Sequence, residues 1–237
     1  MNKKRCLISG SAGFIGAHLV QYILEKTDWD IVCLDRYDTS GNINRLAEVI
    51  KEDQKKRVKI VYHDLKAPIN EFTSRAITPV DNIIHLAASS HVDRSIEDPM
   101  SFIMDNVVGT TNMLIWAKNG GMKNELVPGI NHCFDCGGPR KCDYGEPDSW
   151  CVDGIVLSGK KSGKFINFST DEVFGPAAEG HNHGEDEAHR PSNPYSASKS
   201  GQEAIGYAFY VTYGLPVITT HTMNNFAIRQ HPEKLLP

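Results

Sequence analysis

Gly10-Ser11-Ala12-Gly13-Phe14-Ile15-Gly16 is the stretch of sequence that decides the fold. It follows the apolar run Lys4–Ser9 and opens a segment of helical periodicity, Phe14–Lys26. Glycines at this spacing permit a tight turn, close approach of the backbone to a pyrophosphate, and close packing of helix on sheet. The helix N-terminus adds free N–H groups and the positive end of a dipole. The pattern predicts a dinucleotide site, although a flexible turn also fits glycines taken alone. Its residues are Gly10, Gly13, Phe14, Ile15 and Gly16.

Short apolar runs alternate with helical patterns along the chain, which indicates βαβ units and a parallel sheet. The predicted strands are Lys4–Ser9, Asp30–Leu34, Val58–Tyr62, Asn82–Ala87, Lys164–Ser169 and Pro216–His221. The predicted helices are Phe14–Lys26, Asn42–Asp53, Pro99–Lys118 and Tyr195–Tyr213. Nearly continuous apolar strands are typical of a sheet covered on both faces. Right-handed crossovers then predict an α/β fold with a Rossmann-like, doubly wound parallel sheet.

Residues 1–222 are predicted to form this NAD-binding domain, and residues 223–237 to begin a substrate-binding region that is left incomplete. Residues 119–163 show neither helical nor strand periodicity, which predicts an irregular Cys-rich insertion. Two interpretations of its cysteines are open: four thiolates bind a structural zinc ion, or they remain reduced thiols in a loop. The four residues are Cys133, Cys136, Cys142 and Cys151.

Composition excludes several classes of protein. The chain has 237 residues, of which 40% are hydrophobic and 23% charged, with a net charge of -4. This is ordinary for a globular protein, so we expect neither wholesale disorder nor collagen-like structure. No block of basic residues indicates nucleic-acid binding, and no apolar run approaches the roughly 20 residues that span a membrane. We therefore expect a soluble, cytoplasmic protein with reduced cysteines.

Acidic residues follow the next two predicted strands. Asp35 lies about 20 residues beyond the glycine motif, where a carboxylate hydrogen-bonds the ribose hydroxyls of the dinucleotide. Because a carboxylate there would repel a 2′-phosphate, the sequence favours NAD over NADP, while the neighbouring Arg36 keeps NADP open. Asp64 and Leu65, just after the third strand, are predicted to meet the adenine; a simple turn is the alternative.

Tyr195 and Lys199 lie one helical turn apart on the same face of a predicted helix. A phenol with an ordinary pKa of about 10 needs a nearby positive charge to act as a base, and Lys199 and an oxidised nicotinamide are both candidates. Asp171 and Glu172 follow Ser169-Thr170 at the end of a predicted strand. A surface helix pair and a solvated loop pair are the structural alternatives for these two motifs.

Four stretches in order resemble the extended short-chain dehydrogenase/reductases that act on nucleotide sugars. They are the glycine motif, His85 to Ile96 (HLAASSHVDRSI), Ser169 to Gly175 (STDEVFG), and Tyr195 to Lys199 (YSASK). Within that family the second and third stretches are similar to the dTDP-glucose 4,6-dehydratases. Asn224-Asn225 and Pro232 to Pro237 also fit this subgroup.

The resemblance implies roles for matching residues. Tyr195, assisted by Lys199, would take the proton of the sugar 4-hydroxyl, while Thr170 hydrogen-bonds the same oxygen. Glu172 would remove the C5 proton, and Asp171 would protonate the departing 6-hydroxyl. The implied cofactor contacts also include Leu86, Ala87, Ala88, Ser90, Asp105, Tyr195, Lys199 and Asn225. The implied substrate contacts are Ser90, His91, Thr170, Asn224, Lys234 and Leu235.

The resemblance further implies a homodimer formed through a four-helix bundle of the Pro99–Lys118 and Tyr195–Tyr213 helices. The expected activity is NAD-dependent dehydration of a dTDP- or UDP-hexose to its 4-keto-6-deoxy form. A nucleotide-sugar 4-epimerase or decarboxylase, and a non-catalytic NAD-binding module, are the alternatives. His181, His183 and His189 lie among acidic residues. A metal cluster is one interpretation of them, and a solvated, flexible flap is the one that their composition favours.

Overall fold

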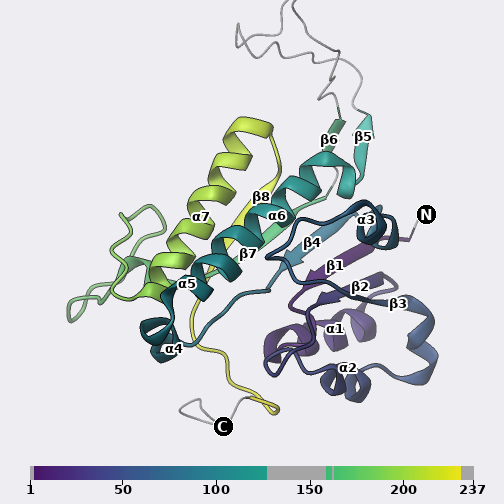
Figure 1. Cartoon of the computed structure of the whole chain (residues 1–237), viewed down its shortest axis with the longest axis horizontal. Helices are drawn as coiled ribbons and strands as arrows, with labels where there is room; N and C mark the ends of the chain where they lie inside the picture. The colour runs from purple at the N-terminus through teal and green to yellow at the C-terminus, as the bar shows by residue number, and fades with distance from the viewer. Residues whose placement is uncertain (1–2, 127–158, 162, 231–237) are drawn as a thin grey trace, which may run out of the picture.

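Six parallel strands form the central sheet, in the order β3-β2-β1-β4-β7-β8 (Figure 1). The computed structural model describes residues 3–126, 159–161 and 163–230. The strands are β1 (Arg5–Ser9), β2 (Asp30–Asp35), β3 (Val58–Tyr62), β4 (Asn82–His85), β7 (Phe165–Thr170) and β8 (Val217–Thr222). Each lies close to its predicted bounds, so the Rossmann-like α/β fold is confirmed.

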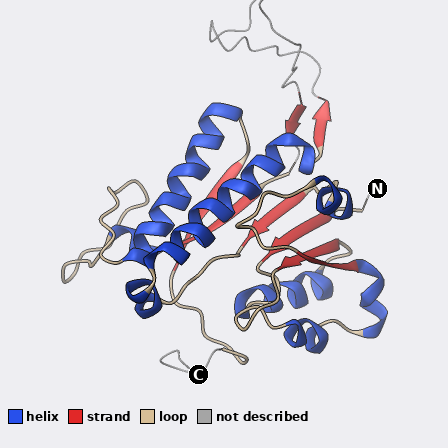
Figure 2. Cartoon of the chain, viewed as in Figure 1, coloured by secondary structure: helices blue, strands red, loops and turns tan. Residues whose placement is uncertain are grey.

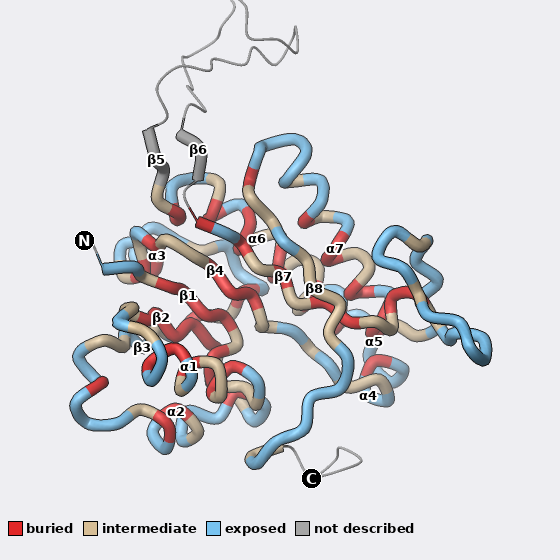
Figure 3. Tube along the Cα trace, turned by 180° about the vertical axis from the view of Figure 1, so that it is seen from behind, coloured by how far each residue is buried: buried red, intermediate tan, exposed pale blue. Residues whose placement is uncertain are grey.

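Helices cover both faces of the sheet (Figure 2). On one face lie α1 (Phe14–Lys26) and α2 (Ile43–Val49), and on the other α3 (Glu71–Ile77), α6 (Gly109–Trp116) and α7 (Pro194–Tyr213). Successive strand residues serve the two faces in turn: Cys6 and Ile8 of β1 pack toward α1, and Leu7 packs toward α6. Residues of β1 and β2 are therefore almost all buried (Figure 3).

Two of the predicted helices change in detail. The helix predicted at Asn42–Asp53 ends at Val49, because Ile50 is extended, and a 3-10 helix, η1 (Glu52–Arg57), follows. The helix predicted at Pro99–Lys118 is confirmed, but part of it is π-helical. It consists of α5 (Pro99–Phe102), η2 (Ile103–Val108), α6 and η3 (Ala117–Gly121). The helices α3 and α4 (Val92–Glu97) are not predicted by the sequence.

The structure adds short elements near both ends of the segment predicted to be irregular, 119–163. The helix η3 ends at Gly121 after non-helical backbone at Asn119 and Gly120, and β5 (Asn124–Leu126) pairs antiparallel with β6 (Gly159–Lys161). A bridge from Met122 to Val80 holds this hairpin beside the amino end of β4. Cys133, Cys136, Cys142 and Cys151 lie outside the described residues. Within the described part of the chain, none of the helices has the length and apolarity needed to cross a bilayer.

Candidate functional site

A cavity opens at the carboxyl ends of β1, β2 and β4, where the strand order reverses. This position is the usual ligand site of a doubly wound sheet. The predicted cofactor residues that line it are Gly10, Gly13, Asp35, Arg36, Asp64, Leu65, Leu86, Ala87, Ala88 and Asp105. Sequence reasoning missed Leu34, Asp38, Ser40, Gly41, His63 and Lys66, which also line it. The sequence could have indicated Asp38, Ser40 and Gly41, because these turn-forming residues closely follow β2.

The glycine turn fits the backbone cradle that a dinucleotide requires. Gly10 has a φ of +70°, and a Cβ there would lie 2.7 Å from the backbone nitrogen of Ala87. A Cβ on Gly16 would lie 2.1 Å from the carbonyl oxygen of Gly10, so α1 rests directly on the turn. Phe14 and Ile15 form the first residues of α1. The helix N-terminus is thereby held at the cavity, where its N–H groups can bind phosphate.

Asp35 connects the end of β2 to the glycine turn. Its Oδ2 accepts a hydrogen bond from the Ala12 backbone nitrogen at 2.9 Å, and its Oδ1 accepts one from the Tyr37 nitrogen at 3.1 Å. Burial raises the pKa of Asp35, although these backbone hydrogen bonds lower it. The carboxylate lines the cavity beside the glycines, where the sequence predicts it.

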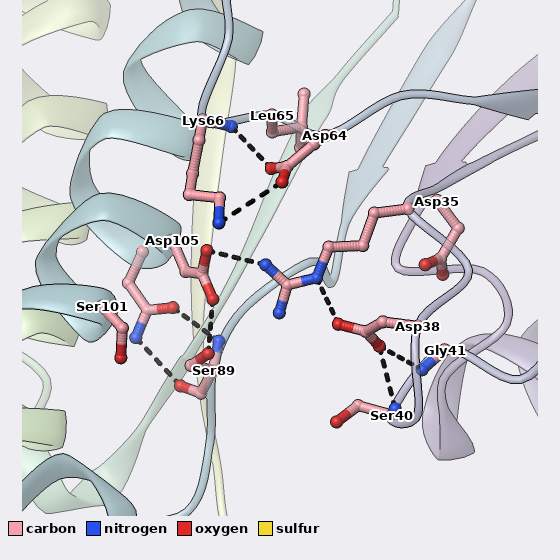
Figure 4. A network of polar contacts seen from close by, with 12 residues as sticks. Asp35, Asp38, Ser40, Gly41, Asp64, Leu65, Lys66, Ser89, Ser101 and Asp105 are labelled. Atoms are coloured by element: carbon pink, nitrogen blue, oxygen red, sulfur yellow. Dashed lines mark hydrogen bonds and ion pairs between the residues drawn. The ribbon is translucent and has the colours of Figure 1, made fainter. Parts of the chain in front are cut away.

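Arg36 crosses the cavity to Asp105, which lies on η2. Its guanidinium donates to Asp105 Oδ1 at 2.8 Å and to Asp38, while Ser89 Oγ donates to Asp105 Oδ2 at 2.6 Å (Figure 4). Burial would lower the pKa of Arg36, but the two carboxylates together raise it. With Arg36 held by two acids, and with Asp35 and Asp64 also on the wall, the cavity disfavours an additional phosphate.

Thr170 ends β7 and caps the short 3-10 helix η4 (Asp171–Phe174). Its Oγ1 accepts a hydrogen bond from the Glu172 backbone nitrogen at 3.3 Å. The same hydroxyl donates to Asp171 Oδ1 at 3.2 Å. The cap therefore fixes the threonine and both acids at the carboxyl end of the sheet.

The start of α7 fixes Tyr195. Asn193 caps the helix by accepting a hydrogen bond from the Ser196 backbone nitrogen at 2.8 Å, and Pro194 takes the first helical position. Tyr195 consequently lies in the first turn and is buried. Its backbone nitrogen donates to Ser95 Oγ at 3.1 Å.

The four predicted reacting groups meet around the phenol of Tyr195. Burial raises the pKa of Tyr195 to about 12. The negative charges of Glu172 and Asp171 raise it as well, whereas a hydrogen bond with Thr170 lowers it. Asn193 Nδ2 donates to Glu172 Oε2 at 3.3 Å, which joins the cap of α7 to one of the acids. Thr170, Asp171, Glu172 and Tyr195 thus form one cluster.

Lys199 lies one turn further along α7 and is also buried. Its ammonium donates to the Phe168 carbonyl oxygen and, at 2.7 Å, to Gln202 Oε1. Burial lowers the pKa of Lys199 to about 7, although the charge of Glu203 raises it. The bond to Phe168 ties the lysine to β7.

In the described part of the chain, the predicted contacts Ser90, His91, Asn224 and Asn225 do not line the cavity. Ser90 is exposed, and His91 precedes α4. Asn224 and Asn225 are exposed beyond β8, where Asn225 Nδ2 donates to the Met223 carbonyl oxygen at 3.0 Å. Lys234 and Leu235 lie outside the described residues.

Comparison with known proteins adds three findings. The model of the NAD dependent epimerase/dehydratase family matches residues 6–237. The dTDP-glucose 4,6-dehydratase of Shigella flexneri is 33% identical over 242 residues, covering 98% of this chain and 58% of that protein. The structure of DesIV, a dTDP-glucose 4,6-dehydratase from Streptomyces venezuelae with NAD and TYD bound, has a TM-score of 0.75 and 32% identity. It covers 98% of this chain and 60% of DesIV.

A UDP-N-acetylglucosamine 4-epimerase from Methanobrevibacter ruminantium has the same fold, with a TM-score of 0.71 and 22% identity. That similarity covers 99% of this chain and 59% of the epimerase. The chain therefore spans about three fifths of the length of the relatives that it matches.

Proposed function

The chain belongs to the NAD dependent epimerase/dehydratase family, and we propose that it removes water from a nucleotide-hexose of the dTDP- or UDP-glucose type. The product is the 4-keto-6-deoxy sugar. The names of the relatives, dTDP-glucose 4,6-dehydratases, support this reaction. The observation that carries the proposal is the convergence of Thr170, Asp171 and Glu172 on the phenol of Tyr195.

Tyr195 and Thr170 act at the sugar 4-hydroxyl. The phenolate form of Tyr195 accepts the hydroxyl proton, and the Thr170 hydroxyl hydrogen-bonds the same oxygen. Gly10, Gly13 and the other residues of the cavity wall would hold NAD, which would supply the hydride acceptor for C4, the hydride donor for C6 and a positive charge near the phenol. Lys199 adds its charge through space.

Glu172 and Asp171 carry out the elimination. The 4-ketone acidifies the C5 proton, which the Glu172 carboxylate accepts, and the C6–oxygen bond breaks as protonated Asp171 gives its proton to the leaving hydroxyl. One water is released, and C6 then gains a hydride while C5 regains a proton from Glu172.

An epimerase or a decarboxylase is the alternative within the family. Neither reaction expels a hydroxyl from C6, so neither requires a proton donor at position 171. Asp171 lies close enough to the phenol for its charge to raise the Tyr195 pKa, which favours dehydration over these alternatives.

The test is incubation of the purified chain with NAD and dTDP-glucose, then with UDP-glucose, followed by analysis of the sugar product. We expect a 4-keto-6-deoxy sugar, and accumulation of bound NADH in Asp171→Asn because oxidation proceeds without loss of the hydroxyl. A C4 epimer would establish the alternative reaction. NAD binding without any product would establish a binding module and contradict the proposed activity.

We also propose a homodimer through η2, α6 and α7. These three elements expose a set of large apolar side chains that a second copy would cover: Ile103, Ile115, Tyr207, Tyr210 and Val211. Light scattering of the purified chain should give twice the monomer mass, and Val211→Glu should give the monomer mass. A monomer at all concentrations would contradict the dimer.

The predictions for residues outside the cavity and outside the cluster around Tyr195 remain proposals. We propose that Asn225 contacts the cofactor. The proposed substrate contacts are Ser90, His91, Asn224, Lys234 and Leu235. Zinc at the four cysteines is a separate proposal, which rests on their spacing alone. Metal analysis of the purified chain and of Cys133→Ser tests it, and equal zinc content in both would contradict it.

A further inference from the structure

Two imidazoles and one carboxylate converge beneath the carboxyl ends of β7 and β8, outside the cluster around Tyr195. His221 Nε2 lies 2.9 Å and His189 Nε2 3.5 Å from the same atom, Glu203 Oε2. The three groups come from β8, α7 and the loop that precedes α7. We call His189, Glu203 and His221 the His–Glu–His cluster; its three nearest ligand atoms all lie within 4.8 Å of one another.

The cluster is held in place by its surroundings. Ser169 pairs with His221 in the sheet register, and its hydroxyl donates to Glu203 Oε1, which leaves Oε2 directed at the histidines. The ring of Phe174 packs against His221 and His189, with centroid separations of 4.8 and 5.4 Å. The Glu203 side chain is only 10% exposed, so this carboxylate is largely withdrawn from water.

These donors suit a late first-row divalent cation. Neutral imidazole nitrogen and carboxylate oxygen are ordinary Zn²⁺ ligands, with bonds of about 2.0–2.2 Å. A tetrahedral ion with such bonds places neighbouring ligand atoms about 3.3 Å apart. The separations of 2.9 and 3.5 Å from Glu203 Oε2 bracket that value. Ser169 supplies the outer hydrogen bond that metal-binding carboxylates normally have.

We propose that His189, Glu203 and His221 bind one Zn²⁺-type ion, with water in the fourth position. The ion ties the loop before α7 to both α7 and β8. That loop ends at Asn193, which caps α7 and hydrogen-bonds Glu172. The ion therefore positions the loop that leads to the reacting groups, and no step of the sugar reaction passes through it.

A second group, His181, His183 and Glu187, lies on the same loop and provides a matched comparison. Its residues are close in sequence, and His181 and Glu187 are 50% and 38% exposed. His183 Nδ1 hydrogen-bonds Glu187 Oε2 at 2.7 Å, as His221 Nε2 hydrogen-bonds Glu203 Oε2 at 2.9 Å, so this contact does not distinguish the two groups. The geometry favours the His–Glu–His cluster, because its ligands come from three separate elements and its carboxylate is buried.

The test uses the full chain, stripped of metal with a chelator and titrated with ZnCl₂ in a calorimeter. We expect a binding event, distinct from any event at the four cysteines, that His189→Gln and His221→Gln each weaken by at least about 100-fold. Ser169→Ala should weaken it by about 10–100-fold, as loss of an outer partner does. His181→Gln, the matched control, should bind as the unmodified chain does. Thermal unfolding should show a rise in Tm with Zn²⁺ that is absent in His189→Gln.

A parallel titration with CoCl₂ separates this site from the cysteines. Co²⁺ on nitrogen and oxygen ligands gives only weak visible bands, whereas thiolate ligands add intense charge-transfer absorption. We expect the weak bands of nitrogen and oxygen ligands to disappear in His189→Gln, while any thiolate bands from the cysteines stay unchanged. If His221→Gln does not fold, those weak bands and their loss in His189→Gln decide the question.

Two results would overturn the proposal. One is the absence of a Zn²⁺ event that both histidine variants remove, which would leave the cluster as ion pairs alone. The other is loss of binding in His181→Gln with retention in His189→Gln, which would assign the ion to the neighbouring group.

Discussion

Gly16 is the position where a single methyl group tests the dinucleotide site most directly. In Gly16→Ala the new Cβ would lie 2.1 Å from the Gly10 carbonyl oxygen and 2.8 Å from Ser11 Cα, and both are backbone atoms. To restore van der Waals contact, the first turn of α1 must withdraw from the glycine turn by about 1 Å. Overpacking of this kind lowers the free energy of unfolding by about 1–3 kcal/mol.

The same withdrawal moves the N–H groups of α1 away from the pyrophosphate. We expect the affinity for NAD to fall at least about tenfold, which corresponds to about 1.4 kcal/mol. We expect the Tm to fall by about 2–4 °C for each kcal/mol lost in a chain of this size. Calorimetric titration with NAD and thermal unfolding measure the two effects.

Gly184→Ala is the matched control, because its Cβ would meet nothing nearer than Glu187 Oε1 at 3.9 Å. Its unfolding free energy should stay within about 0.5 kcal/mol of the unmodified chain, and its NAD affinity should not change. Gly13→Ala, with a Cβ 3.2 Å from the Gly10 oxygen, should fall between the two. NAD binding and Tm in Gly16→Ala equal to those of Gly184→Ala would refute the reasoning.

Three further predictions concern the titratable groups. Tyr195→Phe removes the phenolic hydroxyl but keeps the ring against Phe102. The kcat should therefore fall by about 10²–10⁴-fold while the NAD affinity stays unchanged. An equal loss of NAD affinity would contradict a catalytic role. Asp35→Asn removes a charge that repels a 2′-phosphate, so the affinity for NADP should rise about tenfold relative to the affinity for NAD. Calorimetry measures both affinities, and an unchanged ratio of the two would count against a ribose contact. Lys199, with a pKa of about 7 when folded and 10.5 when unfolded, binds its proton more weakly in the folded chain. The free energy of unfolding should therefore rise from about pH 7 to 9.5, by up to about 1.4 kcal/mol per pH unit, and Lys199→Met should abolish this rise; identical pH profiles of denaturant unfolding would disprove it.

The strands and α1 could be predicted because their signals are local. β1 and β2 are nearly continuous apolar runs, and all but their first residues are buried. The helices α3 and α4 give no such signal. The first buries only Thr73 and Ile77 and leaves Phe72 85% exposed, while the second buries only Ser95. Short helices that bury so little carry no apolar period for a sequence to display.

The cluster around Tyr195 could be predicted because each of its motifs lies beside the carboxyl edge of the sheet. Contacts that depend on register could not. Arg36 meets Asp105 only because η2 passes over the end of β2, and the two residues are far apart in sequence. Glu203 of α7 meets His221 of β8 because α7 packs beside the paired residues Ser169 and His221. Histidines scattered among acids look the same in sequence whether they converge or face water.

The β5–β6 hairpin has a consequence for where the length of this chain can change. The chain departs at Leu126 and returns at Gly159 on adjoining backbone positions, beside the amino end of β4. The chemistry lies at the opposite rim of the sheet. The segment that connects these two points can therefore change in length without displacing the residues around Tyr195.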